Sequence, residues 1–74
     1  MPLVSINIME GRPPERIEKM IVAVSEAIAD SLEAPIASVR IMVNEMHEHQ
    51  YGVGGKPWRV VREERARAAT RDAG

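Results

Sequence analysis

The chain has no cysteine and no phenylalanine, and its only aromatic residues are one Trp and one Tyr. The lack of cysteine excludes disulfide bonds and thiolate metal sites. A core without large rings has to be built from aliphatic side chains and methionine. A chain of 74 residues buries only about 60% of its unfolded surface, so it is marginal alone. Because disulfides are excluded, subunit association is the expected source of the missing buried area.

Long apolar runs and an excess of charge of one sign are also lacking. The formal net charge is −1, so no field of the whole chain favours nucleic acid or an anionic membrane. No apolar run approaches the roughly 20 residues that span a bilayer. The N-terminus lacks the basic and apolar regions of a signal peptide. We therefore expect a cytoplasmic protein with no nucleic-acid or membrane partner.

Two segments with alternating apolar residues flank one segment with a helical period. From Leu3 to Ile8, apolar residues occupy every second position, which predicts a strand with one buried face. From about Pro14 to Leu32 they recur at steps of three and four, which predicts an amphipathic helix. Pro35 ends this helix, since the residue before a proline is pushed out of the α region. Val39 to Met46 alternates again, so we expect a βαβ unit with parallel strands.

The last third of the chain has a weaker pattern. Tyr51–Gly55 holds three glycines and predicts a turn or hairpin. Trp58–Val61 is either a short strand or an arm, and from Glu63 onward we expect either a short frayed helix or a disordered tail. These elements make one α+β domain over residues 1–74, with about 59–74 as the arm or tail. A second copy of the chain would cover the edge and face that a two-stranded sheet leaves open.

Pro2 is a candidate general base. Proline is small enough at the second position for the usual removal of Met1. The free nitrogen of an N-terminal residue has a pKa of about 7.7–8.0, which an apolar wall and nearby cations lower further. A base whose pKa lies near the operating pH is best suited to moving protons. The alternative is that the Met-Pro start has no chemical role.

Arg12 and Arg40 are candidate anion-binding residues. Arg12 follows the first strand, and Arg40 lies inside a short apolar strand, where its charge needs solvent, a carboxylate or a cleft between subunits. Pro2 lies about 20 Å from Ile8, at about 3.3 Å per residue. One chain therefore cannot readily bring Pro2 beside both arginines, which predicts a site shared between subunits. A salt bridge is the alternative role for Arg40.

Three other features give weaker signals. His47 and His49 form a His-x-His pair, but a metal site needs at least a third ligand, so no metal is expected. The glycines between residues 52 and 55 lack the Lys and Ser/Thr of a phosphate loop. The arginines that follow Trp58 alternate with acidic residues, so we expect a solvated tail rather than a nucleic-acid surface.

Several segments between Pro2 and about Gly55 are informative as an ordered set. They are Pro2 behind Met1, Ile6-x-Ile8-x-Glu10-Gly11-Arg12, Val24-Ser25-Glu26-Ala27-Ile28, Leu32-Glu33-Ala34-Pro35, Ser38-Val39-Arg40, Asn44-Glu45-Met46 and Tyr51-Gly52-Val53-Gly54-Gly55. Together they resemble 4-oxalocrotonate tautomerase, a family with an amino-terminal proline. No single motif decides this resemblance, but the ordered set at this chain length is specific.

The resemblance implies a βαβ unit with a C-terminal hairpin, two chains that pair into a four-stranded sheet, and three such dimers in a homohexamer. It implies that Pro2 is the general base and that Arg12 binds the distal carboxylate of the substrate. Arg40 reaches a neighbouring subunit's site and holds the carboxylate and 2-oxo end. Tyr51 replaces the family's phenylalanine beside the proline, and its hydroxyl adds polarity that changes the pKa of the base or the substrate preference. Ile8 and Met9 are implied to line the same substrate site.

The implied reaction converts 2-hydroxymuconate to 2-oxo-hex-3-enedioate in aromatic hydrocarbon catabolism, without a cofactor. Two separated arginines suit a small acid with two carboxylates, because arginine holds a carboxylate bidentately, and they stabilise developing charge. A dehalogenase or hydratase of the same superfamily is one alternative, with Glu48 as the nearest carboxylate to activate water. A non-catalytic companion subunit of a hetero-oligomer is another. Such a subunit would keep Met1, since an acylated Pro2 has no basic lone pair.

Overall fold

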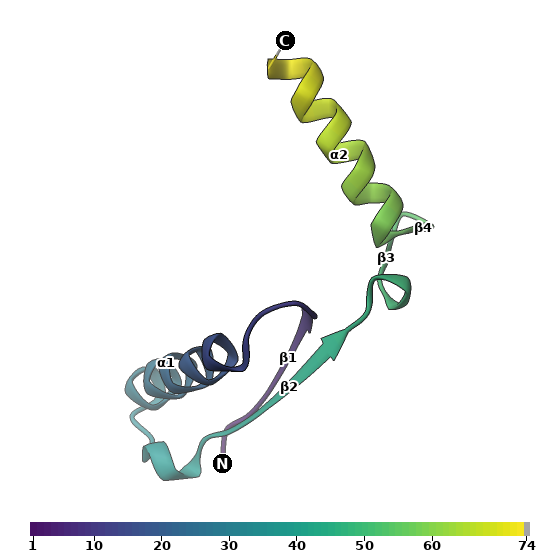
Figure 1. Cartoon of the computed structure of the whole chain (residues 1–74). Coiled ribbons are helices and arrows are strands. Elements are labelled where there is room, and N and C mark those ends of the chain that lie inside the picture. Colours follow the sequence, from purple (N-terminus) through teal and green to yellow (C-terminus); the bar gives the residue numbers. More distant parts are fainter. Residues whose placement is uncertain (74) are drawn as a thin grey trace.

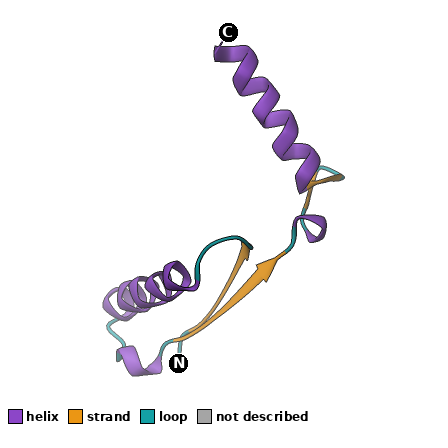
Figure 2. Ribbon diagram, in the orientation of Figure 1, coloured by secondary structure: helices purple, strands orange, loops and turns teal. Residues whose placement is uncertain are grey.

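The computed structural model describes residues 1–73, with side chains described through Ala69. Two strands and a helix come first, and a small hairpin and a second helix follow (Figures 1 and 2). In chain order the elements are β1 (Leu3–Met9), α1 (Pro14–Leu32), a 3-10 turn (Ile36–Ser38), β2 (Arg40–Met46), a second 3-10 turn (Glu48–Gln50), β3 (Gly52–Val53), β4 (Lys56–Pro57) and α2 (Trp58–Ala73).

Strands β1 and β2 pair in parallel, which confirms the predicted βαβ unit. The register runs from Leu3 opposite Arg40 to Met9 opposite Met46. Along β1, burial alternates as the sequence predicts, with Ile6 half-buried and Leu3 exposed. Helix α1 lies beside this sheet (Figure 1) and shields one of its faces. The other face stays open within the single chain.

Helix α1 has the predicted bounds, but the residue that caps its C-terminal end has an unusual backbone conformation. Pro13 caps its first turn with an extended backbone, and Glu15 is the acidic residue of that turn, where it suits the positive end of the helix dipole. At the other end Glu33 adopts the left-handed conformation, with φ 53° and ψ 43°, and its N–H donates to the carbonyls of Ala29 and Asp30. This conformation costs a residue with a Cβ about 1–2 kcal/mol.

The predicted hairpin is confirmed at β3 and β4. Val53 pairs with Lys56 in antiparallel fashion, and Gly54 and Gly55 form the two-residue loop with φ of +60° and +84°. A tight hairpin with positive φ at both loop positions favours glycine at each. The loop turns the chain back so that Trp58 follows directly on β4.

The segment after the hairpin differs in part from its prediction. Trp58–Val61 is not a strand, because it forms the first turn of α2, and the helix reading of the residues after Glu63 is correct as far as Ala73. Arginine, alanine and glutamate are good helix formers, and an ion pair of 3.5 Å joins Arg59 to Glu63 one turn apart. Helix α2 points away from β1, β2 and α1 (Figure 1).

The single chain does not enclose a core of its own. Among the residues with described side chains, only Ala29 and Val61 are buried, while Leu3 and Leu32 are 68% and 63% exposed. The radius of gyration is 16.9 Å, against about 11 Å for a compact domain of this length. The accessible area is 5785 Å², against about 4,500 Å² for a folded monomer of this mass. This excess of open surface supports association with further subunits. No helix in residues 1–73 has the length and apolarity that crossing a membrane requires.

Candidate active site

Pro2 and Arg40 lie together at one end of the sheet. The backbone N–H of Arg40 donates to the carbonyl oxygen of Pro2 at 3.0 Å. The Arg40 guanidinium bends back along its own chain, where Nη1 donates to the carbonyl of Ala37 at 2.6 Å. The sequence placed Arg40 inside the second strand. It is in fact the first residue of β2, and the parallel register therefore sets it beside the start of β1.

Arg12 lies at the other end of β1. The chain leaves the strand through Gly11, whose φ of +123° suits a residue without a Cβ. Nη1 of Arg12 then donates to the carbonyl of Met9 at 3.0 Å, so the guanidinium folds back on the strand that it follows. Within the residues with described side chains, Arg12 and Arg40 form no ion pair with a carboxylate. Both cations therefore stay available to an anionic ligand.

A hollow of about 290 Å³ lies next to this second end. Its lining includes Ile8 and Met9 from β1 and Tyr51 from the start of the hairpin, so the structure brings three of the predicted substrate-binding residues together. Asn7, Met46, Trp58 and Arg65 complete the lining. The Tyr51 and Trp58 rings meet edge to face, 5.6 Å apart at 62°, an arrangement that aromatic pairs favour.

The sequence did not indicate Trp58 or Arg65 as part of this hollow. Their place depends on the two-residue loop of the hairpin, which reverses the chain, and on the helix that starts at Trp58. The Trp58 N–H donates to the Tyr51 carbonyl at 2.8 Å and fixes the start of α2 against the hollow. The usable sequence signal was the Gly54-Gly55 pair, which predicts a tight hairpin and hence a return of the chain.

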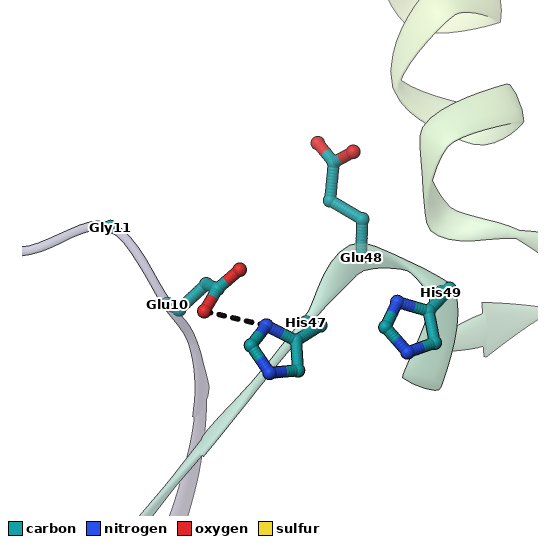
Figure 3. A pocket seen from close by; sticks show the side chains of 5 residues that line it. All are labelled: Glu10, Gly11, His47, Glu48 and His49. Carbon is teal, nitrogen blue, oxygen red and sulfur yellow. Dashed lines mark ion pairs between the residues drawn. The ribbon is translucent and has the colours of Figure 1, made fainter.

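The two histidines border a separate hollow of about 510 Å³, shown in Figure 3. Nδ1 of His47 lies 2.7 Å from Oε2 of Glu10, and the rings of His47 and His49 stack at 5.4 Å. The Glu48 side chain points away from both rings (Figure 3) and pairs with Arg62. Within the described residues no three His, Cys, Asp or Glu side chains are arranged to hold a metal ion.

The predicted site residues thus form two separate groups in one chain. Pro2 and Arg40 belong to the first, and Ile8, Met9, Arg12 and Tyr51 belong to the second. Strand β1 lies between them and spans about 23 Å from Pro2 to Met9, at about 3.3 Å per residue.

Comparison with known proteins decides the family. The family described as tautomerase enzyme matches residues 2–60, which include every one of these predicted residues. The chain belongs to the tautomerase family. It is 45% identical over 62 residues to a 2-hydroxymuconate tautomerase of Pseudomonas sp. (strain CF600), a match that covers 84% of this chain and 98% of that protein. A 2-hydroxymuconate tautomerase of Pseudomonas putida is 48% identical over 56 residues, which are 76% of this chain and 89% of that protein.

Solved structures agree with this assignment. This tautomerase is similar to a heterohexamer 4-oxalocrotonate tautomerase from Chloroflexus aurantiacus J-10-fl, with a TM-score of 0.77 and 32% sequence identity. The match covers 80% of this chain and 95% of that chain. The fold is therefore the α+β fold that the sequence predicted, and the protein is an isomerase that interconverts keto and enol forms. The family match ends at residue 60, so most of α2 extends past it.

Proposed function

We propose that this tautomerase acts on a small dicarboxylic acid and converts 2-hydroxymuconate to 2-oxo-hex-3-enedioate in the breakdown of aromatic compounds. The observation that carries the proposal is that β1 has one cation at each end, so that two chains paired in antiparallel fashion bring an Arg40 and an Arg12 to each shared site. Arg40 lies beside Pro2, and Arg12 lies at the far end of the same strand beside Met9. The relatives that share 45–48% identity are named 2-hydroxymuconate tautomerases, which supports this substrate.

Pro2 is the general base in this proposal. Met1 is 86% exposed, which leaves the Met1–Pro2 bond open to removal of the methionine. The amine that this frees accepts the proton of the 2-hydroxyl group and returns it to C5. The double bonds shift at the same time, so that C2 becomes a ketone and the remaining alkene lies between C3 and C4. One proton moves from one atom of the substrate to another, so the proposed reaction consumes no cofactor.

The two arginines hold the ends of the substrate. We assign the carboxylate and 2-oxo end to Arg40, where a guanidinium stabilises the negative charge that develops on the oxygen. Arg12 takes the distal carboxylate. Ile8, Met9 and Tyr51 form the wall of the substrate site, since the hollow that they line lies at the Arg12 end.

A second chain completes the site. Two chains that pair in antiparallel fashion through the free edge of β1 form a four-stranded sheet, and the Pro2 end of each chain then meets the Ile8 end of the other. This pairing also covers open apolar surface such as Leu3, which is 68% exposed in the single chain. We propose a homohexamer of three such dimers, with a hetero-oligomer as the alternative. The cytoplasmic location stays a prediction from the sequence.

The hydratase or dehalogenase alternative lacks a free carboxylate at the expected place. Glu48 was the nearest candidate to activate water, but its carboxylate is paired with Arg62 of α2 and points away from His47 and His49 (Figure 3). A base that is already held by an arginine is a weak acceptor for a proton from water. The tautomerase reaction, which has no need of this carboxylate, is therefore favoured.

Intact mass and activity together test the proposal. The protein is purified once from normal cells and once from cells in which methionine aminopeptidase is inhibited, which gives chains without and with Met1. The chain that begins at Pro2 is expected to convert 2-hydroxymuconate, and the chain that keeps Met1 is expected to be inactive. Equal activity of the two preparations would rule out the Pro2 amine as the base. If neither preparation is active, 2-hydroxymuconate is not the substrate.

A further inference from the structure

Helix α2 contributes an arginine to the hollow at the Arg12 end of β1. Arg65 lines this hollow together with Ile8, Met9 and Tyr51. Its Cζ lies 5.3 Å from the centre of the Trp58 ring, within the range of a cation–π contact. Arg65 lies beyond residue 60, where the family match ends. The family assignment therefore gives this residue no role.

Trp58 holds Arg65 in a defined position. The Trp58 ring is itself fixed by its edge-to-face contact with Tyr51 and by the hydrogen bond from its backbone N–H to the Tyr51 carbonyl. Arg65 follows Trp58 by seven residues, or about two helical turns, so both side chains lie on the same side of α2. This side faces the hollow. A guanidinium that stacks on a ring by its face leaves the N–H groups of its edge free to bind a carboxylate.

The other arginines near the start of α2 already have carboxylate partners. Arg59 pairs with Glu63, and Arg62 pairs with Glu48. Within the residues with described side chains, Arg65 makes no such ion pair and contacts the Trp58 ring instead. Its charge is therefore available to an anion in the hollow, whereas Arg59 is paired within α2 and Arg62 joins α2 to the 3-10 turn that contains Glu48.

We propose that Arg65 is a specificity-determining residue, which binds the distal carboxylate of the substrate together with Arg12. This inference rests on the proposed function, because it adds a ligand contact to the same site. Arg65 and Met9 both line the hollow, and Arg12 donates to the carbonyl of Met9, so Arg12 is held at the end of the strand that borders the hollow. A carboxylate has two oxygens and four lone-pair positions, enough for two guanidinium groups. The consequence is a preference for dicarboxylates over monocarboxylates.

A binding experiment tests this preference without turnover. Muconate and sorbate are six-carbon dienes with two carboxylates and one carboxylate, and neither has the 2-hydroxyl group that tautomerises. Trp58 is the only tryptophan of the chain, so its fluorescence reports ligands that enter the hollow. The wild-type full-length protein is expected to bind muconate more tightly than sorbate. Arg65→Gln is expected to weaken muconate binding about tenfold, as for the loss of one charged hydrogen bond, and to leave sorbate binding unchanged.

Arg65→Lys and Arg67→Gln are the matched variants. Lysine keeps the charge without the planar guanidinium, so Arg65→Lys is expected to restore part of the muconate affinity. Residue 67 lies two positions, or about 200°, further around the helix than residue 65, and Arg67→Gln is expected to bind muconate as the wild type does. Circular dichroism then shows whether α2 keeps its helix content in every variant.

The outcomes separate this inference from the proposed function. If Arg65→Gln keeps the full preference for muconate, or loses muconate and sorbate equally, Arg65 is only a structural part of the wall and the inference is wrong. If the preference falls as expected, the inference stands. Failure of the wild type to convert 2-hydroxymuconate would overturn the proposed reaction alone, because muconate binding is measured without catalysis. If the wild type does convert it, Arg65→Gln is expected to raise KM about tenfold with kcat unchanged.

Discussion

The backbone N–H of Arg40 donates a hydrogen bond of 3.0 Å to the carbonyl oxygen of Pro2. This bond continues the β1–β2 ladder by one step beyond Leu3, so the sheet itself sets the position of the residue proposed as the base. The ring of proline ties its nitrogen to its own side chain, and the ladder fixes its carbonyl. The nitrogen that removal of Met1 exposes is therefore held in place before any substrate binds.

Replacing this proline should lower catalysis without loss of the fold. Pro2→Ala still allows removal of Met1, but it leaves a primary amine on a residue with a freer backbone. We expect kcat for 2-hydroxymuconate to fall about 100-fold, the lower end of what a positioned acid–base group contributes. Continuous ultraviolet assay of substrate loss measures this effect, and intact mass confirms that Met1 is gone. A variant with the rate of the wild type would mean that another group is the base.

A mixture of two variants of low activity should regain activity if two chains share each site. Arg12→Ala removes the cation at the Met9 end, and Pro2→Ala removes the base at the other end. When the two variants are co-expressed in equal amounts, random pairing leaves about one quarter of the sites with both groups intact. We expect about that fraction of the wild-type rate in the purified mixture. Each variant expressed alone is the control, and a mixture no better than the mean of the two would place the whole site in one chain.

The open face of the sheet should be an interface between subunits. Met42 lies on this face opposite Ser5 and is 47% exposed in the single chain. Met42→Asp would place an unpaired charge in the interface at a cost of about 3 kcal/mol or more, so we expect association about 100-fold weaker. Size-exclusion chromatography with light scattering measures the mass. Ser31→Asp, on the exposed surface of α1, is the control that should keep the wild-type mass.

The sequence was sufficient for the elements whose signal is local. Strand β1 and helix α1 each have an apolar period that covers most of their length, and such a period predicts type and extent together. Helix α2 has no comparable apolar stripe, and Trp58, Val60 and Val61 at its start are residue types common in strands. Its helical state depends instead on helix-forming residues and on ion pairs such as Arg59–Glu63.

The candidate site residues could be named from the sequence, but their arrangement could not. Arg40 lies at the Pro2 end because the parallel register sets it opposite Leu3, and the apolar alternation within each strand does not report which residues of the two strands pair. The sequence alone places Arg65 in a solvated tail, because its ring partner, Trp58, and the hollow come together only through the hairpin. Contacts of this kind join residues through tertiary structure, and no periodicity in the sequence reports them.

The left-handed end of helix α1 offers a route to higher stability that does not touch the site. Glu33 has φ 53°, a conformation that glycine adopts without the clash of a Cβ. Glycine also loses more entropy on folding, so Glu33→Gly is expected to raise the free energy of unfolding by about 0.5–1 kcal/mol. Glu33→Ala keeps the Cβ and is the control, with no comparable gain expected. Urea denaturation at one fixed protein concentration measures both variants, because the stability of an oligomer depends on concentration. If Glu33→Gly and Glu33→Ala change the free energy of unfolding by the same amount, the left-handed conformation of Glu33 is not a source of strain.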